Sequence, residues 1–224
     1  EGNTNTTTVS GRIETTGATA TDEGTTYGAF GIYNEGNKNK TTLSGSIETT
    51  GRFGHGIYNE GASNKTTLSG SITTSGTNGY GIVNDGNTNT TTVSGSITTG
   101  VVGTNAGEDS TGIWNYGNDN TTTLTSTGVI TVNGPKADGI YNSSGDKNIT
   151  IVHGSIFVNG NGVATERARQ NDDYAEGITN YGDDNETTLS GSITTTGNYA
   201  MGIANYGNNN KVTISGTIKS TGEK

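Results

Sequence analysis

One motif, G-I-x-N-x-G-N-x-N-x-T-T-L-S-G-S-I-x-T-T-G, recurs along nearly the whole chain. Its copies begin at Gly31, Gly56, Gly81, Gly112, Gly139, Gly177 and Gly202. The shortest and commonest spacing between copies is 25 residues, and insertions lengthen the others. A period of this length is typical of a supersecondary unit that cannot bury its apolar face alone and therefore stacks on its neighbours. The sequence thus predicts a solenoid.

Three apolar columns recur within the copies. The first is Ile32, Ile57, Ile82, Ile113, Ile140, Ile178 and Ile203. The second is Val9, Leu43, Leu68, Val93, Leu124, Val152, Leu189 and Ile214. The third is Ile13, Ile47, Ile72, Ile97, Ile130, Ile156, Ile193 and Ile218, with Ile130 arriving two residues late. The repeats are rich in Thr, Ser, Gly and Asn and lack helical periodicity, so each column predicts one short strand per coil, in about eight coils.

Two asparagine columns lie between the first and second predicted strands. The first, which we expect to form a structural ladder, is Asn34, Asn59, Asn84, Asn115, Asn142, Asn180 and Asn205. The second is Asn5, Asn39, Asn64, Asn89, Asn120, Asn148, Asn185 and Asn210. An amide carries both a donor and an acceptor, so asparagines one coil apart are expected to pair amide to amide. Asn also tolerates the left-handed backbone of a sharp corner.

Composition narrows the classes of function. Only 26% of the residues are hydrophobic, and the net charge is −9, which together would favour disorder if the repeat were not so regular. The acidity makes nucleic acid and anionic membrane improbable partners. There is no cysteine, and no apolar run is long enough to cross a membrane. His55 and His153 lack catalytic partners in the sequence, so we expect surface or strand positions for both.

Insertions are the first candidate for function, since they map to loops on one side of a solenoid. They span residues 15–30, 100–111 and 158–176, and all leave between the third strand of one coil and the first strand of the next. The last holds a dense mixed-charge patch that either contacts a partner or is a solvated loop: Glu166, Arg167, Arg169, Asp172, Asp173 and Tyr174.

Aromatic residues are the second candidate. Tyr33, Tyr58, Trp114 and Tyr141 directly follow the first apolar column, and Tyr116, Tyr181 and Tyr206 come two residues later. Period-two alternation turns both positions outward. Their rings are expected to stack between coils and stabilise the ladder, or to receive a glycan or a partner protein.

Several other functions stay open at this point. Hydroxyl rows on the second strand resemble those of ice-binding solenoids, although Thr is also a strong strand former. The N-x-T sequence recurs at Asn5, Asn39, Asn64, Asn89, Asn120, Asn148 and Asn185, where N-glycosylation competes with a buried asparagine. Asp172, Asp173 and Glu176 are the carboxylates that a polysaccharide-active β-helix enzyme would use, but no carboxylate cluster is anchored on a predicted strand. No cofactor is indicated, and Ca²⁺ binding at the aspartates near glycine turns is a minor alternative.

The runs GIYNEGNKNKTTLSGSIETTG at 31–51, GIVNDGNTNTTTVSGSITT at 81–99 and GITNYGDDNETTLSGSITTTG at 177–197 resemble passenger repeats of bacterial autotransporter and adhesin-like surface proteins. The resemblance covers almost the whole chain and implies a right-handed parallel β-helix that acts in adhesion or aggregation outside the cell. The signal peptide and translocator barrel of that class are not in this sequence.

The sequence therefore predicts one β-solenoid domain, residues 1–224, with three short strands in each coil of about 25 residues. Because the chain begins and ends inside a coil, we expect it to be part of a longer surface protein. The expected function is a non-enzymatic extracellular rod that binds a host or bacterial surface glycan or protein, or itself. The alternative is a filament or biofilm-matrix subunit that stacks end to end through unpaired strand edges.

Overall fold

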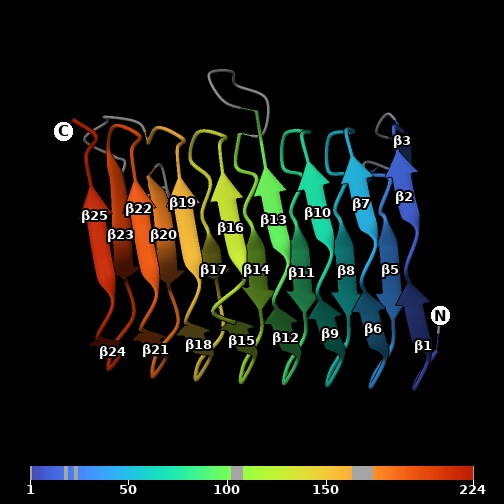
Figure 1. The fold of residues 1–224 in the computed structure, drawn as a ribbon. Helices are drawn as coiled ribbons and strands as arrows, with labels where there is room; N and C mark the ends of the chain where they lie inside the picture. Colours follow the sequence, from blue (N-terminus) through green and yellow to red (C-terminus); the bar gives the residue numbers. More distant parts are fainter. Residues whose placement is uncertain (1, 18–19, 23–24, 102–107, 163–173, 224) are drawn as a thin grey trace.

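The computed structural model describes residues 2–17, 20–22, 25–101, 108–162 and 174–223. These residues contain no helix, and they wind into a right-handed parallel β-helix, as the repeat predicted (Figure 1). Each complete coil contributes one strand to each of three parallel sheets, which we call sheets 1, 2 and 3 in the order in which a coil that begins at the Gly-Ile motif meets them. The Gly-Ile motif lies at or near the start of each strand of sheet 1.

Sheet 1 has seven strands, ordered β5-β8-β11-β14-β17-β20-β23 along the axis. Their bounds are Ile32–Glu35, Ile57–Glu60, Ile82–Asp85, Ile113–Tyr116, Ile140–Asn142, Ala175–Asn180 and Ala200–Asn205. Sheet 2 has eight strands, ordered β1-β6-β9-β12-β15-β18-β21-β24. Their bounds are Thr6–Val9, Lys40–Leu43, Lys65–Leu68, Thr90–Val93, Thr121–Leu124, Ile149–Val152, Glu186–Leu189 and Lys211–Ile214.

Sheet 3 also has eight strands, ordered β2-β7-β10-β13-β16-β19-β22-β25. Their bounds are Arg12–Thr15, Ser46–Thr49, Ser71–Thr74, Ser96–Thr99, Val129–Val132, Ser155–Val158, Ser192–Thr195 and Thr217–Ser220. The late third column of the fifth copy is confirmed, because Ile130 of β16 pairs with Ile97 on one side and Ile156 on the other. The two extra residues are accommodated before β16 and do not shift the register.

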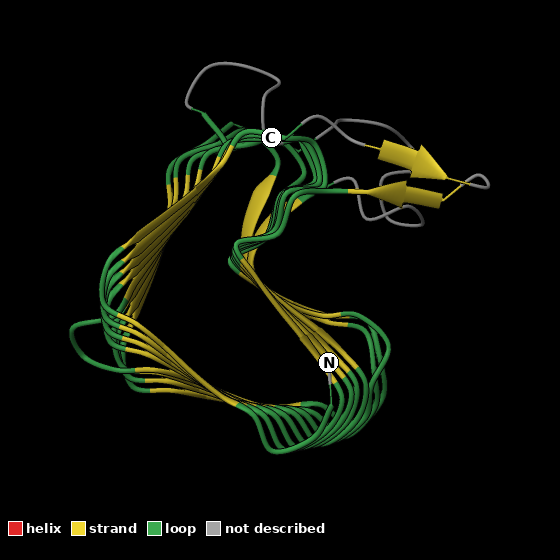
Figure 2. Ribbon diagram, turned by 90° about the vertical axis from the view of Figure 1, so that its right-hand side faces the viewer, coloured by secondary structure: helices red, strands yellow, loops and turns green. Residues whose placement is uncertain are grey.

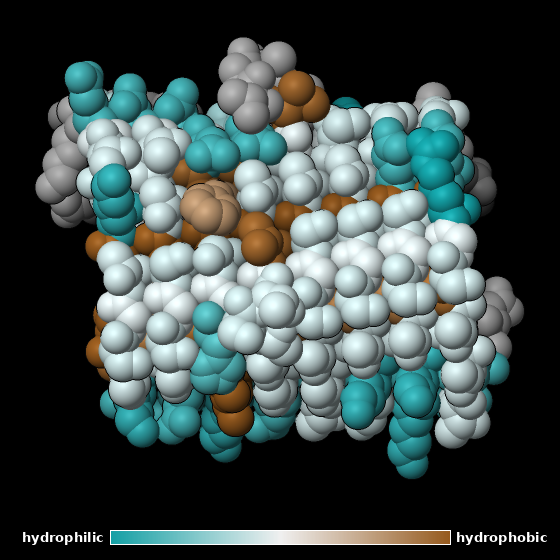
Figure 3. Space-filling view, viewed as in Figure 1, coloured by the Kyte–Doolittle hydropathy of each residue, from teal (hydrophilic) through white to brown (hydrophobic). Residues whose placement is uncertain are grey.

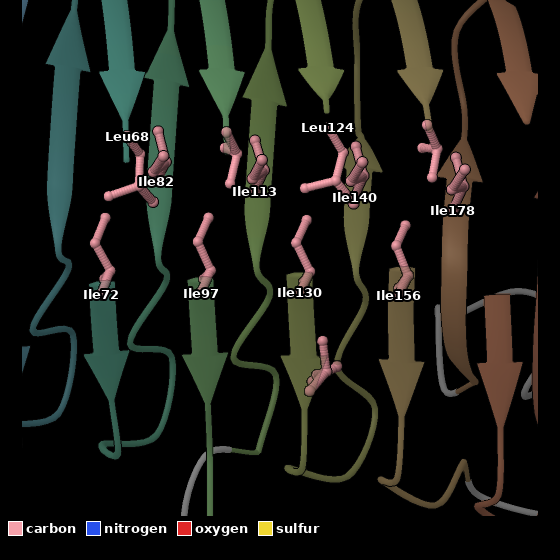
Figure 4. Close-up of a cluster of buried hydrophobic side chains, with 14 of the residues drawn as sticks. Leu68, Ile72, Ile82, Ile97, Ile113, Leu124, Ile130, Ile140, Ile156 and Ile178 are labelled. Carbon is pink, nitrogen blue, oxygen red and sulfur yellow. The ribbon is translucent and has the colours of Figure 1, made fainter. Parts of the chain in front are cut away.

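The core is a narrow column of aliphatic side chains enclosed by the three sheets. Figure 4 shows isoleucines of sheet 3, such as Ile72 and Ile97, pointing toward Leu68 of sheet 2 and Ile82 of sheet 1. These side chains are fully buried. Burial of one such side chain stabilises a fold by about 1.5–3 kcal/mol, so the repetition of three per coil offsets the low hydrophobic content of the chain.

The first asparagine column forms the predicted amide ladder in the core. Asn59 Nδ2 donates to Asn84 Oδ1 at 2.9 Å, and Asn84 Nδ2 donates to Asn115 Oδ1 at 2.8 Å. The second hydrogen of each amide goes to a buried threonine of sheet 2, as from Asn84 to Thr91 Oγ1 at 3.0 Å. Both amide hydrogens of Asn84 are therefore paired, and these hydrogen bonds offset the cost of removing the polar groups from water.

The second asparagine column forms different hydrogen bonds from those predicted. Its side chains do not pair amide to amide; Asn64 Oδ1 instead accepts the backbone N–H of Asn39 at 2.8 Å, and Asn64 Nδ2 donates to the carbonyl of Gly61 at 3.1 Å. The left-handed residue at this corner is also not the asparagine but the residue before it, as in Lys38 at φ 60°. The asparagines are buried from Asn39 through Asn185, which leaves no room for a glycan at those N-x-T sites.

The glycine of the Gly-Ile pair marks where sheet 3 packs against the start of sheet 1. A Cβ on Gly81 would lie 2.4 Å from Ile97 Cγ2 and 2.5 Å from the carbonyl oxygen of Gly112. Since both contacts are shorter than real Cβ contacts, no side chain fits there. The recurrence of this glycine follows from close packing between coils rather than from an unusual φ.

The three insertions leave the coil between sheet 3 and sheet 1, at what we call the insertion corner. Contrary to the expectation of loops alone, residues 15–30 include a two-stranded antiparallel hairpin, β3 (Ala20–Asp22) and β4 (Thr25–Tyr27), which projects from the corner (Figure 2). Residues 175 and 176 of the third insertion extend strand β20 and pair with β23. The insertion corner is therefore partly built of regular structure.

Candidate functional site

The four predicted aromatic residues Tyr33, Tyr58, Trp114 and Tyr141 lie on the outward face of sheet 1. They share one register position, since Tyr33 pairs with Tyr58 and Trp114 pairs with Tyr141. Tyr33 is 42% exposed, while the other three are half-buried. The alternation of β5 follows directly from its sequence, with Ile32 and Asn34 inside and Tyr33 outside.

A second aromatic column, which sequence reasoning missed, lies at the insertion corner two residues before the Gly-Ile isoleucine. It consists of Phe30, His55 and Tyr80. The Phe30 and His55 rings stack at 5.2 Å between centroids with an interplanar angle of 11°, and the His55 and Tyr80 rings stack at 4.9 Å and 4°. Their spacing of 25 residues was the available signal, although three different ring types obscured it.

The two columns join into one continuous series of ring contacts. Tyr80 meets Trp114 edge to face at 4.9 Å, and Trp114 stacks on Tyr141 at 6.4 Å. Tyr181 stacks on Tyr206 at 4.5 Å and reaches Tyr141 at 5.9 Å. We call this surface the aromatic strip; its members are Phe30, Tyr33, His55, Tyr58, Tyr80, Trp114, Tyr116, Tyr141, Tyr181 and Tyr206.

A recurring hydrogen bond connects the hydroxyl or indole N–H of a strip residue to a side chain of the next coil. Tyr33 Oη donates to Glu60 Oε2, Tyr58 Oη donates to Asp85 Oδ2 at 2.7 Å, and Trp114 Nε1 donates to Ser143 Oγ at 2.5 Å. Each acceptor lies three residues after the Gly-Ile isoleucine of its coil. Burial and then the carboxylate contacts raise the pKa of the Tyr33 and Tyr58 phenols well above 10. The rings are therefore neutral and fixed in orientation.

The sequence predicted a surface or strand position for His55. The structure instead places it outside any strand and within the aromatic strip, where it is 6% exposed. Burial lowers its pKa to about 4. Its Nδ1 accepts the backbone N–H of Tyr80 at 3.0 Å, so an added proton at Nδ1 would face a donor. His55 thus acts as a neutral stacking ring. His153, by contrast, is exposed, and its Nδ1 lies 2.6 Å from Ser190 Oγ.

Two carboxylates occupy the same column position on neighbouring coils farther along the strip. Asp138 is 3% exposed and Glu176, on β20, is fully buried. Asp138 accepts the backbone N–H of Glu176 at 2.8 Å and lies 2.9 Å from Thr179 Oγ1, which also contacts Glu176 Oε2. Tyr206 Oη donates to Glu176 Oε1 at 2.7 Å. The expectation that no carboxylate cluster is anchored on a strand is thus corrected for Glu176 alone, because Asp138 lies two residues before β17.

The arrangement of this pair is structural rather than open to a substrate. Both side chains are nearly or fully inaccessible, and each has carboxylate oxygens engaged by neighbouring protein groups. A catalytic acid or base must come within hydrogen-bond reach of the group it protonates or deprotonates, and the full burial of Glu176 prevents this for that residue. Of the other predicted carboxylates, Asp172 and Asp173 lie outside the described residues.

The rest of the predicted mixed-charge patch is also not described. Glu166, Arg167 and Arg169 lie outside the described residues, and only Tyr174 falls within them, half-buried immediately before β20. Among the described side chains, no three of the His, Asp and Glu type come together as ligands for a metal ion. That part of the chain also has no helix capable of spanning a bilayer.

A pocket of about 310 Å³ opens beside the middle of the strip, at the insertion corner of three successive coils. It is lined by Asn78, Tyr80, Asp109, Thr111, Lys136, Asp138 and Tyr141. Lys136 Nζ forms an ion pair with Glu108 Oε1 at 3.3 Å. Sequence reasoning placed Tyr141 on the strip but did not foresee the pocket.

The faces formed by sheets 2 and 3 differ from the strip in chemistry. Figure 3 shows a surface of mainly intermediate hydropathy there, because Thr and Ser fill most of the outward positions. The predicted hydroxyl row of sheet 2 includes Thr92, Thr123 and Thr188 and is broken by Ile151. Comparison of the chain with family models, with curated proteins and with solved structures found no match.

Proposed function

We propose that this chain is a non-enzymatic structural and adhesive rod of an extracellular bacterial surface protein, with the aromatic strip as its contact face. The observation that carries the proposal is the unbroken series of ring contacts from Phe30 to Tyr206. Aromatic rings are enriched at the centres of recognition surfaces because they bury large areas with few rotatable bonds.

The rigidity of the strip favours binding. The rings are held by stacking and by hydrogen bonds to the next coil, so a ligand need not immobilise them, and the entropic cost of association falls. Glu35 and Glu60 lie exposed along one edge. The strip therefore suits an extended, uncharged or cationic partner such as a glycan chain or a protein segment.

Repetition multiplies weak contacts into a useful affinity. Neighbouring coils present related ring pairs at the spacing of the β-ladder, roughly 4.8 Å, so a long ligand is able to engage several at once. The extracellular location rests on the resemblance of the repeats to passenger segments. The absence of cysteine and the acidic charge agree with it.

The test is adhesion of beads coated with the purified chain to host-cell and bacterial-cell layers. A Tyr33→Ser, Tyr116→Ser double variant removes the two most exposed rings, 42% and 50% exposed, with little effect on stability. The matched control is Phe157→Ser with Ile149→Ser, which removes side chains of 37% and 40% exposure from sheets 3 and 2. We expect the strip variant to lose adhesion and the control to keep it. Equal adhesion of wild type, strip variant and control would refute the role of the strip.

End-to-end assembly into a filament or biofilm matrix is the second candidate. The last coil leaves Ile214 and Ile218 51% and 38% exposed, and such docking would cover them. Sedimentation and negative-stain microscopy across a concentration series separate the two functions. Fibres that grow with concentration would favour the filament, and a short monomer would favour the adhesive rod.

A further inference from the structure

We propose that the pocket beside Tyr80 and Tyr141 binds one uncharged pyranose ring of a glycan. This inference rests on the proposed adhesive function and specifies the ligand class of the same face.

The pocket exists because the second aromatic column stops. Phe30, His55 and Tyr80 fill the position two residues before the isoleucine in three consecutive coils. The next two coils place Thr111 and Asp138 there, 5% and 3% exposed. Both side chains are smaller than a ring, so the space that a fourth and a fifth ring would occupy is left over as the pocket.

The shape of this space favours a flat six-membered ring. Tyr80 stacks on His55 at an interplanar angle of 4° and meets Trp114 in a T-shaped contact at 70°. A ring lying above Thr111 would pack beside Tyr80 and Tyr141, the two aromatic rings that line the pocket. A volume of about 310 Å³ is at the lower end of ligand pockets, which hold roughly 300–1,000 Å³, so it suits one sugar unit.

The polar lining of the pocket favours a sugar over an aromatic side chain of a partner protein. Five of the seven lining residues are polar or charged, and Asn78, Asp109, Thr111 and Lys136 supply both acceptors and donors around the edge. A pyranose offers C–H groups to the tyrosine face and hydroxyl groups to this edge. A purely aromatic ligand would desolvate those polar groups without replacing their hydrogen bonds.

The charge of the pocket selects against acidic sugars. The lining includes two aspartates, Asp109 and Asp138, and one lysine, Lys136, whose Nζ forms an ion pair with Glu108. The local excess of negative charge agrees with the net charge of −9 for the chain. A carboxylated sugar such as a sialic or uronic acid would meet like charges, which disfavours its binding.

The decisive variant restores the missing ring. Thr111→Phe should fill the pocket as Tyr80 fills the same position one coil earlier, so it should block the ligand, although it removes the Thr111 Oγ1 that accepts the backbone N–H of Asp138 at 3.4 Å. The matched control is Thr98→Phe, which adds the same ring on the outward face of sheet 3. Asp109→Asn is a second variant; it keeps a residue type that tolerates the φ of 54° at this position.

The probe is a glycan array with neutral hexose and N-acetylhexosamine termini beside sialylated and uronic-acid termini. The affinity for the best neutral monosaccharide is then measured through the fluorescence of Trp114, the single tryptophan, which contacts both pocket tyrosines. We expect a neutral pyranose to bind, with at least about tenfold weaker binding in Thr111→Phe and none of this loss in Thr98→Phe. If Thr111→Phe does not fold, Asp109→Asn is required to reduce the preference for neutral over acidic termini, because it removes one negative charge from the lining.

Three results would overturn the inference: no neutral glycan bound by the wild type, a preference for acidic glycans, or undiminished binding when the pocket is filled. The adhesion assay keeps this outcome separate from the proposed function. Adhesion that survives Thr111→Phe but not the Tyr33→Ser, Tyr116→Ser double variant would refute the pocket and leave the adhesive strip in place. Adhesion that survives both variants would refute the strip itself.

Discussion

Asn142 Nδ2 donates a hydrogen bond to Asn180 Oδ1 at 2.7 Å although 38 residues separate the two in the sequence. The longer connection between these two coils therefore does not change the register of the ladder. The same holds for Asn84 and Asn115, which are 31 residues apart and 2.8 Å from amide to amide. The ladder fixes the geometry of the rod, while the insertion corner varies around it.

We expect substitution of an asparagine in the middle of the ladder to destabilise the fold more than substitution in its last coil. Asn115→Ala leaves the Asn84 amide without its acceptor and the Asn142 carbonyl without its donor, both buried. Each unsatisfied buried group costs about 1–3 kcal/mol, so we expect a loss of about 2–5 kcal/mol in the free energy of unfolding, measured with urea. Asn205→Ala is the control. Because Asn205 is exposed and accepts from Asn180 at the last coil, its loss should be below about 1.5 kcal/mol.

A pair of equivalent glycines tests close packing between coils. A Cβ on Gly95 would lie 1.9 Å from the carbonyl oxygen of Gly70 in the preceding coil, whereas a Cβ on Gly11 meets nothing within 4 Å because no described coil precedes it. We expect Gly95→Ala to cost at least about 2 kcal/mol and Gly11→Ala to stay within about 0.5 kcal/mol of wild type. Equal effects in urea denaturation would show that backbone conformation, not contact, governs this corner.

The indole of Trp114 provides a test of how firmly the strip is held. Its Nε1 donates to Ser143 Oγ, and both groups are half-buried. Ser143→Ala removes the acceptor while keeping the backbone, so we expect a loss of about 0.5–1.5 kcal/mol and increased rotational freedom of the indole in fluorescence anisotropy. Thr127→Ala, which removes an exposed hydroxyl that donates to the carbonyl of Ser94, should leave the anisotropy unchanged. If Ser143→Ala also left it unchanged, stacking alone would hold the ring.

The columns of identical residues made most of the fold predictable. Ile72 and Ile97 repeat one residue type at one register position, so the strands, the three sheets and the first amide ladder could be placed from spacing alone. The second asparagine column was assigned to the right corner with the wrong hydrogen bonds. An amide side chain serves equally well as a partner for an amide or for a backbone N–H, and only the turn geometry decides between them.

The aromatic column at the insertion corner escaped prediction for the opposite reason. Phe30, His55, Tyr80, Thr111 and Asp138 share a position but no residue type, so no motif marks them. The pocket arises because the side chain at this column position becomes smaller between Tyr80 and Thr111. No sequence motif marks such a change in side-chain size, so it becomes apparent only when the coils are stacked in the structure. The buried pairing of Asp138 and Glu176 was hidden in the same way, by an insertion that separates them by 38 residues.

His55 gives the fold a pH dependence of known sign. Its pKa falls from 6.5 in the unfolded chain to about 4 in the folded one, so the unfolded state binds more protons between these values. The stabilisation present at neutral pH is therefore lost as the pH falls below 6.5. From pH 7.5 to 5.5, where most carboxylates stay ionised, we expect a loss of about 1.4 kcal/mol in the free energy of unfolding.

His55→Phe should abolish this part of the pH dependence, since the position then carries a ring that does not titrate, like Phe30 in the preceding coil. His153→Phe is the matched control, and because His153 is exposed it should leave the pH dependence in place. The measurement is urea denaturation of all three proteins at pH 7.5 and 5.5. Parallel pH profiles for wild type and His55→Phe would mean that the histidine is already solvated in the native coil, and the stacked, neutral ring described here would then be wrong.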